Sequence, residues 1–326
     1  MTGHASESVA ICVVTYNSAA QLQGLVDSLP AGASGVAWHL VVADNASSDD
    51  SVATVRRLAP EATLVQVGRN AGYAAGVNAA LAAAAPYTAA LVLNPDVRLQ
   101  PGCLPALLTA LRAPGVGIAV PRLIDAAGEL ILSQRREPTL ARAFADALVG
   151  AERAGRTVRF GEVVSDPARY EREVDLDWAE GSTQLISAEC LRTCGSWDES
   201  FFLYSEETEF DLRARDHGFA VRYVPTAQAV HLEGGSGQTP ALWSLLVLNR
   251  VRLFRRRNAL PRTVLFWLAI MLREASRAVL GWRTSRAALR RLIDPRSIRQ
   301  LFGRTAGPAG STSIARSTTA APLGEF

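Results

Sequence analysis

Two acidic stretches of this sequence hold residues whose types and spacing could bind and activate a charged substrate. In the first, Asn94, Pro95 and Asp96 follow directly after the apolar residues 90–93. Proline cannot continue a β-ladder, so this motif is expected to end a buried strand. A carboxylate placed like that of Asp96 can hold a divalent cation against a phosphate. An isolated Asn-Pro-Asp turn is more often structural, so its interpretation depends on the other motifs.

In the second stretch, Glu206, Glu207 and Glu209 follow the aromatic-rich residues 201–204. The pattern predicts an amphipathic helix that begins near Ser205, with the serine as its N-cap. Carboxylates in a first helical turn complement the helix dipole, which is a purely structural explanation. The alternative is that one of them is a general base. Glu206 and Glu207 would point about 100° apart, so they cannot both face one substrate equally.

Three further polar stretches follow apolar runs. Residues 15–17 come after the run 9–14, and the polar residues 44–51 come after the run 38–43. Residues 68–78 form a glycine-rich turn that opens an alanine-rich helix. Small residues there permit close backbone approach, and a helix N-terminus attracts phosphate. This turn matches neither a Walker loop nor Gly-x-Gly-x-x-Gly, so a tight helix contact is the alternative.

These motifs need a scaffold whose strands end at one edge, and the apolar pattern predicts one. Strands are expected near residues 9–14, 38–43, 63–67 and 90–93, alternating with helices that end near 29, 59 and 85. This alternation predicts an α/β fold with a doubly wound, mostly parallel sheet. Ligands of such sheets bind outside the carboxyl ends of the strands. Later segments are a helix at 140–154, a small-residue turn at 178–182 that opens a strand to 187, and a strand at 221–225.

Composition indicates a globular chain with a lopsided charge distribution. The chain has 326 residues, is 48% hydrophobic, and all 34 of its basic residues are arginine. Residues 1–240 hold 18 arginines and 28 acids, whereas residues 241–304 hold 15 arginines and two acids. The four cysteines form no Cys-x-x-Cys pair, which predicts buried free thiols in a reducing compartment. The start of the chain lacks the features of a signal peptide.

The basic C-terminal region is expected to be a helical appendage. Residues 1–240 would form the catalytic domain, 241–302 a basic amphipathic helical region, and the Gly/Ser/Thr-rich residues 303–326 a disordered tail. Residues 241–301 could lie on an anionic membrane surface. The alternative is ordinary packing on the body with solvated arginines. The longest apolar run, 264–272, has nine residues, and a spanning helix needs about 20. No nucleic-acid recognition motif is present.

Four motifs in this order resemble the donor-nucleotide half of family 2 glycosyltransferases, which have the GT-A fold. They are Val-Thr-Tyr-Asn at 14–17, Val-Ala-Asp-Asn-Ala-Ser at 42–47, Arg-Asn-Ala-Gly-Tyr at 69–73 and Leu-Asn-Pro-Asp at 93–96. The resemblance covers about residues 9–257 and is greatest to bacterial rhamnosyltransferases that use dTDP-L-rhamnose. Asn94 departs from the family's Asp-x-Asp, and an amide is a poorer ligand for a hard cation.

The resemblance implies an inverting glycosyltransferase that moves a sugar, most often L-rhamnose, onto a cell-envelope or polysaccharide acceptor, including lipid-linked ones. Glu207, in place of the family's aspartate, would be the catalytic base. Asp96 and His231 would bind Mg²⁺ or Mn²⁺. The acceptor would contact Trp178, Gly181, Ser182 and Glu206, although a tryptophan at position 178 is more often a core residue than a ligand. The donor nucleotide would contact Thr15, Tyr16, Asn17, Asp44, Asn45, Arg69, Asn70, Gly72, Asn94 and Asp96.

Other functions remain open at this point. The donor could be UDP-GlcNAc, UDP-galactofuranose or a GDP-sugar, and Asn94 and Glu207 would also suit a degenerate, non-catalytic glycan-binding module. A sugar nucleotidyltransferase would need a basic glycine-rich loop near the first strand, and residues 15–18 offer none. The enzyme is expected to be cytoplasmic and peripheral on the inner face of the cell membrane.

Overall fold

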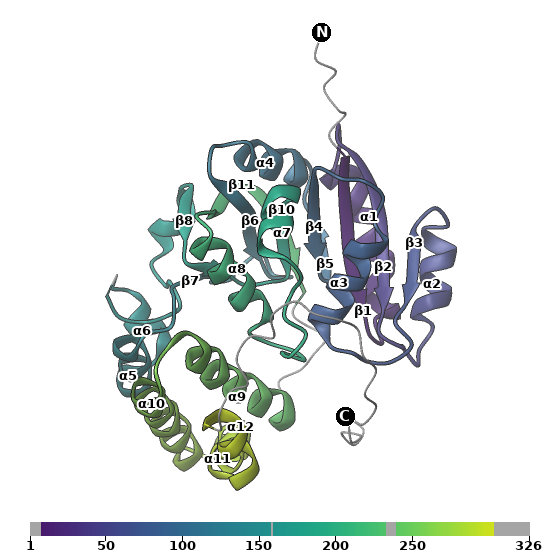
Figure 1. Ribbon diagram of the computed structural model, residues 1–326. Helices are drawn as coiled ribbons and strands as arrows, with labels where there is room; N and C mark the ends of the chain where they lie inside the picture. The colour runs from purple at the N-terminus through teal and green to yellow at the C-terminus, as the bar shows by residue number, and fades with distance from the viewer. Residues whose placement is uncertain (1–7, 158, 233–238, 303–326) are drawn as a thin grey trace.

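The computed structural model describes residues 8–157, 159–232 and 239–302 (Figure 1), so the predicted tail at 303–326 lies outside the described residues. Its centre is a nine-stranded sheet with the order β3-β2-β1-β4-β10-β6-β11-β5, and β8 pairs with β11. A two-stranded sheet joins β7 to β9. The strands are β1 Ser8–Thr15, β2 Ala37–Asp44, β3 Thr63–Gln66, β4 Ala89–Leu93, β5 Val97–Leu99, β6 Val116–Ile124, β7 Gln134–Arg135, β8 Val174–Leu176, β9 Trp178–Ala179, β10 Thr183–Ser187 and β11 Ala220–His231.

The N-terminal half of the sheet has the predicted parallel arrangement. β1 pairs in parallel with β2 and β4, and β2 pairs in parallel with β3. The apolar runs form these strands because both faces of a parallel sheet are covered. Their carboxyl ends therefore lie at one edge, where Thr15 is the register partner of Asp44.

The C-terminal half of the sheet is mixed. β10 runs antiparallel to both β4 and β6, while β11 is parallel to β6 and antiparallel to β5 and β8. The prediction that residues 178–182 open a strand ending at 187 is confirmed by β10, and the structure adds the short β9 before the turn at 180–182. That turn starts the antiparallel β10 at the same edge where the parallel strands end.

Helices cover both faces of the sheet, as the α/β prediction requires. Alternate residues of β1 face opposite sides: Val9, Ile11 and Val13 pack with helices α1 and α4, whereas Ala10 and Cys12 pack with α3, α7 and α8. The helices are α1 Ala19–Gly32, α2 Ser51–Leu58, α3 Tyr73–Ala83, α4 Cys103–Leu111, α5 Leu140–Val149, α6 Ala151–Gly155, α7 Ala188–Cys194, α8 Glu206–Asp216, α9 Pro240–Arg257, α10 Leu260–Val279, α11 Arg283–Ile293 and α12 Pro295–Phe302, with a short 3-10 helix at Pro167–Glu171.

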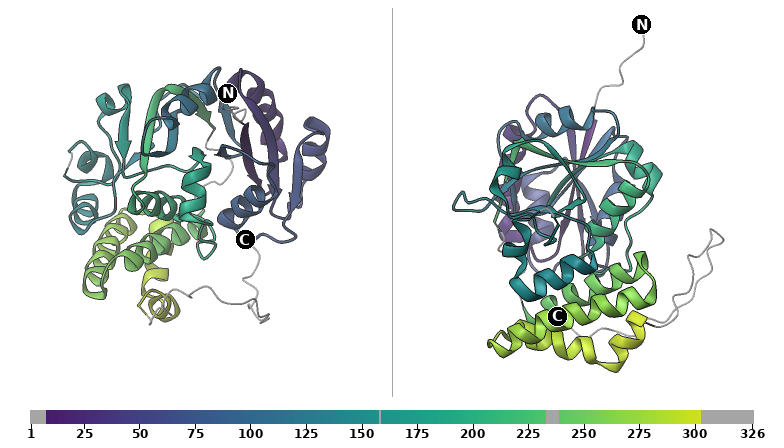
Figure 2. Two further views of the ribbon diagram at one scale, coloured as in Figure 1. Left: turned by 45° about the horizontal axis from the view of Figure 1, so that its top comes forward. Right: turned by 90° about the vertical axis from the view of Figure 1, so that its left-hand side faces the viewer.

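The C-terminal helices form a separate layer with its own core, beneath one end of the sheet and the helices that cover it (Figure 2). Val251, Phe254 and Phe266 are among its buried residues, and Phe254 stacks on Phe266 with ring centroids 4.0 Å apart. Helix α5 from the middle of the chain joins this core through Ala143. The predicted helix 140–154 breaks at Gly150, whose φ of +87° is unfavourable for other residues.

The four cysteines are buried free thiols, as the sequence predicts. Burial raises the pKa of Cys12 and of Cys103 to about 12. The thiolate is the reactive form of cysteine, so these two side chains act as small apolar core residues.

Candidate active site

The sheet topology brings the two predicted metal ligands, Asp96 and His231, together. β4 ends at Leu93, and the Asn-Pro-Asp turn leads directly into β5, where Val97 is the register partner of His231 at the end of β11. The backbone N–H of Leu232 donates to the carbonyl of Asp96 at 3.1 Å. Residues 135 positions apart in the chain therefore share one corner of the carboxyl edge.

Asp96 and His231 are in contact there, with Glu180 on the other side of the imidazole. His231 Nε2 lies 3.4 Å from Asp96 Oδ1, and His231 Nδ1 lies 3.8 Å from Glu180 Oε1. Burial acts to raise the pKa of Asp96, but the hydrogen bond and the charge of His231 outweigh it and leave that pKa lowered. Asp96 is therefore an ionised carboxylate that is able to hold a cation.

The donor set fits a cation that is shared with a phosphate group. Among the described residues, no group of three or more His, Cys, Asp and Glu side chains is arranged to hold a metal by itself. Asp96 and His231 supply one carboxylate and one imidazole. Mg²⁺ in phosphate-binding sites is commonly held by one or two carboxylates, with substrate phosphates and water completing its shell. The two side chains match that open arrangement, and their role as ligands stays a prediction.

The turn before β10 completes this corner. The backbone N–H of Asn94 donates to the carbonyl of Ser182 at 2.9 Å, and Ser182 Oγ donates to Glu180 Oε2 at 2.9 Å. Gly181 packs against Glu207, because a Cβ at Gly181 would lie 2.8 Å from the Glu207 Cβ. Any side chain at position 181 would displace Glu207, so the glycine is required by the close approach of α8.

Glu206 and Glu207 begin α8 over this corner, but the predicted cap is wrong. Ser205 makes no side-chain capping bond, and its φ of +75° is left-handed. Tyr204 before it has a φ of +68°. The turn therefore enters α8 through two residues that rarely adopt this conformation. Only tertiary contacts can hold such a turn, which is why a local capping rule missed it.

The two glutamates differ in their tendency to ionise. Burial, opposed by a backbone hydrogen bond and reinforced by the charge of Glu180, raises the pKa of Glu207 to about 7. Glu206 is only 2% exposed, and burial followed by the charge of Glu207 raises its pKa well above the ordinary value. Glu206 Oε2 has no hydrogen-bond partner. Glu207, which keeps some exposure, therefore ionises before Glu206.

Three residues of this site are not among the predicted site residues. Glu180 touches His231 and Ser182, and its charge acts on Glu207. Arg135 lies with its guanidinium 5.7 Å from the Trp178 ring centre and acts to lower the pKa of Glu207. Tyr73 carries a buried hydroxyl without a hydrogen-bond partner, and its pKa is raised by burial and then by Glu206. Tyr73 is the last residue of the motif at 69–73, and Glu180 directly precedes the predicted acceptor residue Gly181. These positions in the sequence could have indicated that both belong to the site.

Trp178 is buried, at 9% exposure, and its Nε1 donates to the carbonyl of Arg136 at 3.0 Å. This contact agrees with the alternative that Trp178 is a core residue. The guanidinium of Arg135 lies over the Trp178 ring and adds a positive charge beside it. The acceptor roles of Trp178, Gly181, Ser182 and Glu206 stay predictions.

Among the predicted donor residues, Asp44 holds the loop after β2 in place. Its Oδ1 accepts from Thr15 Oγ1 at 2.9 Å, and its Oδ2 accepts from the backbone N–H of Ser47 at 3.0 Å. Asp44 is 2% exposed and Thr15 is fully buried. In the structure both side chains support the loop, and their contact with a nucleotide stays a prediction.

The remaining predicted donor residues divide into buried supports and exposed tips. Asn45 Nδ2 donates to the carbonyl of Gly72 at 2.9 Å, which links the loop after β2 to the glycine turn. Gly72 has a φ of +93°, and a Cβ there would lie 2.3 Å from the carbonyl oxygen of Phe202. The exposed residues at this edge are Tyr16, Asn17, Arg69 and Asn70.

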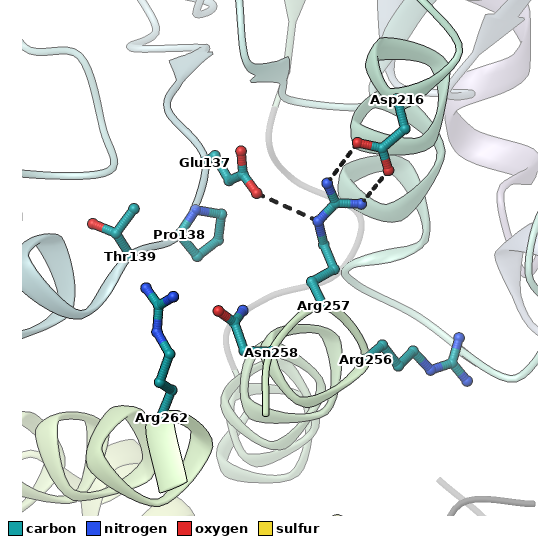
Figure 3. Close-up of a pocket in the computed structure, with 8 residues that line it drawn as sticks. All are labelled: Glu137, Pro138, Thr139, Asp216, Arg256, Arg257, Asn258 and Arg262. Atoms are coloured by element: carbon teal, nitrogen blue, oxygen red, sulfur yellow. Dashed lines mark hydrogen bonds and ion pairs between the residues drawn. The ribbon is translucent and has the colours of Figure 1, made fainter. Parts of the chain in front are cut away.

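A pocket of about 540 Å³ lies at the opposite end of α8 (Figure 3). Arg257 points across it and donates to Asp216 at 2.7 and 2.9 Å and to Glu137 at 3.4 Å. Asp216 is nine residues after Glu207 on the same helix, which is about 14 Å along its axis. This pocket is a junction of ion pairs between the body and the C-terminal helices, and it stands apart from the corner around Asp96.

A mostly parallel, doubly wound sheet covered by helices on both faces is the fold of the GT-A glycosyltransferases. Residues 10–156 match the family model described as "Glycosyl transferase family 2". This match confirms the resemblance to family 2 glycosyltransferases inferred from the four motifs.

Curated relatives extend the similarity beyond that domain. The chain is 29% identical over 250 residues to an N-acetylglucosaminyl-diphospho-decaprenol L-rhamnosyltransferase of Mycobacterium tuberculosis, covering 72% of this chain and 80% of the relative. It is 27% identical over 231 residues to the low-salt glycan biosynthesis hexosyltransferase Agl10 of Haloferax volcanii, covering 69% and 67%.

Solved structures confirm the fold. The mannosyltransferase PcManGT of Pyrobaculum calidifontis, in complex with GDP-Man and Mn²⁺, gives a TM-score of 0.53 at 16% identity, covering 90% of this chain and 82% of that one. Glucosyl-3-phosphoglycerate synthase of Mycobacterium tuberculosis, in complex with Mn²⁺, UDP and glucosyl-3-phosphoglycerate, gives 0.52 at 16% identity, covering 78% and 80%.

Proposed function

We propose that this glycosyltransferase is inverting and transfers L-rhamnose from dTDP-L-rhamnose to a lipid-linked or polysaccharide acceptor of the cell envelope. The observation that carries the chemistry is the position of Glu207, a carboxylate with a pKa near 7 that packs on Gly181 beside the Asp96–His231 pair. The rhamnosyltransferase of Mycobacterium tuberculosis supports the choice of donor and of a diphosphate-linked lipid acceptor.

In this mechanism Glu207 accepts the proton of the acceptor hydroxyl as that oxygen attacks the anomeric carbon. The bond from that carbon to the nucleoside diphosphate breaks on the opposite face, so one displacement inverts the anomeric centre. Asp96 and His231 would hold Mg²⁺ or Mn²⁺, which when bound stabilises negative charge on the departing diphosphate. Glu206, which keeps its proton, can donate a hydrogen bond to a sugar oxygen without competing as a base.

The donor is tested by incubating the full chain with a panel of nucleotide-sugars and an N-acetylglucosaminyl-diphospho-polyprenol acceptor. We expect release of dTDP from dTDP-L-rhamnose, and at least about tenfold less product from UDP-GlcNAc, UDP-galactofuranose and GDP-mannose, a discrimination worth about 1.4 kcal/mol. Preferred turnover of another donor would replace rhamnose in the proposal. Binding without turnover of any donor would favour the non-catalytic alternative.

We also propose that the enzyme docks on an anionic membrane through α10 and the start of α11, a smaller surface than the predicted 241–301. Arginines of α9 are engaged with the body, as in the pairs Arg250–Glu162 and Arg257–Asp216. By contrast, exposed apolar residues on and just after α10 form an apolar face, defined as Leu260, Val264, Leu265, Leu268, Leu272, Val279, Leu280 and Trp282. Exposed arginines lie next to it at positions 262, 283, 286 and 290.

This combination suits the headgroup region, because apolar side chains enter the acyl boundary while arginines contact anionic lipid. Among the described residues no helix is long and apolar enough to cross a membrane. The protein should co-sediment with vesicles that contain phosphatidylglycerol, and the bound fraction should fall as the salt concentration rises. The double variant Leu265→Asp/Leu268→Asp should lose most of this binding.

The matched control is Ala53→Asp, which adds a charge at an exposed position of α2 on the other side of the molecule (Figure 1). It should bind vesicles like the wild type. Equal binding of the Leu265→Asp/Leu268→Asp protein would show that the apolar face is not the membrane contact.

A further inference from the structure

The turn that presents Glu206 and Glu207 is held in an unfavourable backbone conformation. Tyr204 and Ser205 have φ values of +68° and +75°, and both are L residues with a Cβ. Left-handed backbone costs such residues free energy, so it persists only where the surroundings hold it. Ser205 contributes no side-chain cap to α8. The restraint must therefore come from another element.

That element is α9, from the C-terminal helical layer. Asn249 is 5% exposed, and its Nδ2 donates to the carbonyl of Leu203 at 2.9 Å and to the carbonyl of Tyr204 at 3.2 Å. One buried amide group thus binds the two carbonyls that immediately precede the left-handed residue Ser205. These bonds join residues about 45 positions apart, so they fix the turn to α9 rather than to its own neighbours.

The same face of α9 holds the preceding residues of this segment, 198–205, which we call the base loop. Arg252 Nη1 donates to the carbonyl of Ser200 at 2.6 Å, and Arg256 Nη2 donates to Ser200 Oγ at 2.6 Å. Both guanidinium groups lie over the Phe201 ring, 5.3 and 4.6 Å from its centre. Positions 249, 252 and 256 are spaced by three and four residues, so they share one side of the helix.

On its other side the base loop contacts the glycine turn at residues 68–78. The carbonyl of Phe202 accepts from the backbone N–H of Tyr73 at 2.9 Å, directly after the close contact at Gly72. The base loop is therefore fixed between α9 and the start of α3, and a shift at Tyr204 would move the start of α8 relative to the corner around Asp96.

We propose that Asn249 is a positioning residue, which holds the left-handed Tyr204–Ser205 turn so that Glu207 faces the acceptor hydroxyl. This role rests on the proposed function of Glu207. It assigns the C-terminal helices a part in catalysis that is separate from membrane contact, because α9 supplies the restraint while the apolar face lies on and just after α10.

Asn249→Ala removes both donated hydrogen bonds and touches no substrate-facing group. We expect kcat to fall by about 10- to 100-fold, the scale of a misplaced catalytic group, while KM for dTDP-L-rhamnose changes by less than about threefold. Ser244→Ala is the matched control, because Ser244 is also buried on α9 but donates only within its own helix, to Pro240. Its kcat should equal that of the wild type.

A rescue variant distinguishes positioning from a general loss of packing. Glycine adopts positive φ without the penalty of a Cβ, so Ser205→Gly should make the turn less dependent on Asn249. The double variant Asn249→Ala/Ser205→Gly should recover at least about tenfold of the lost kcat. A double variant no more active than Asn249→Ala would overturn the proposal.

Hydrogen exchange of peptides spanning residues 199–210 tests the same role without any activity. Asn249→Ala should exchange faster there and the double variant should return toward the wild type, even if the wild type transfers no sugar from any donor. In that event the proposed function fails while the restraint of the turn is still measured. If Asn249→Ala does not fold, the double variant should fold and retain kcat within about tenfold of the wild type. Unchanged exchange in a folded Asn249→Ala protein would refute the restraint.

Discussion

Glutamine in place of Glu207 is expected to lower kcat by at least about 100-fold, the usual scale for loss of a general base. The substitution keeps the size of the side chain and its packing on Gly181, but the amide cannot accept the acceptor proton. Donor affinity should change little, because the predicted donor residues lie on the loops after β1, β2, β3 and β4. Steady-state kinetics with the identified donor would give kcat and KM separately.

Two neighbouring carboxylates provide controls on the same helix. Glu206→Gln should be milder, because burial raises the pKa of Glu206 and so favours its neutral form, and glutamine is also neutral. Glu209 is a first-turn acid that pairs with Arg213 at 2.9 Å. Glu209→Gln therefore also removes a negative charge from the start of the helix, but at a side chain that is paired with an arginine and is not the proposed base. If Glu209→Gln were as damaging as Glu207→Gln, loss of charge rather than loss of the base would be the cause. Equal damage from Glu206→Gln would instead show that Glu207 is not the only carboxyl group that the reaction requires.

The same assignment fixes the sign of the pH dependence. Below its pKa of about 7 Glu207 carries a proton and cannot accept another, so kcat should rise as the pH increases through about 7 and then level off. A bound divalent cation would move this rise to lower pH, because a positive charge favours the ionised form. Glu207→Gln should lose the rise. A wild-type kcat that is flat between pH 5 and 8 would place the base elsewhere.

Alanine in place of Asp96 is expected to reduce turnover by about 100-fold or more, or to shift it to much higher metal concentrations. Stabilisation of a leaving anion by a metal is worth several kcal/mol, and each 1.4 kcal/mol is about tenfold in rate. The protein should stay folded, because the Asp96 carboxylate contacts His231 at the edge of the sheet rather than the core. Metal titration of activity, with thermal unfolding as the folding check, measures both effects.

A binding measurement separates the metal from other roles of Asp96. Mn²⁺ together with dTDP should raise the unfolding temperature of the wild type but not that of Asp96→Ala, because binding to the native state stabilises it. Glu61→Ala, which removes an exposed acid before β3, should behave like the wild type. Undiminished wild-type turnover in EDTA would remove the metal from the mechanism.

The sequence by itself determined the elements whose signals are local. Apolar runs at 9–14, 38–43 and 90–93 became β1, β2 and β4, because continuous apolar strands must be covered on both faces. The Asn-Pro-Asp turn ended β4 where proline requires it. Each of the four motifs follows a strand, so they were expected to meet at one edge of the parallel sheet. Their resemblance to family 2 glycosyltransferases, rather than this placement, indicated the family.

Tertiary structure alone decided the features that depend on distant partners. The antiparallel insertion of β10 places Glu180 beside His231, and no periodicity within residues 178–187 encodes which strands that segment pairs with. The arginines of α9 form a basic pattern in the sequence, but their partners, such as Asp198 and Asp216, come from elsewhere in the chain.

The chemistry of the base was decided in the same way. Glu207 has a pKa near 7 because of burial against Gly181 and the charge of Glu180, neither of which adjoins it in sequence. The left-handed turn before α8 opposes local preference and is held by Asn249 about 45 residues later. Local propensity sets which segments fold into strands and helices, whereas desolvation, charge proximity and backbone restraint act through space and exist only once the chain has folded.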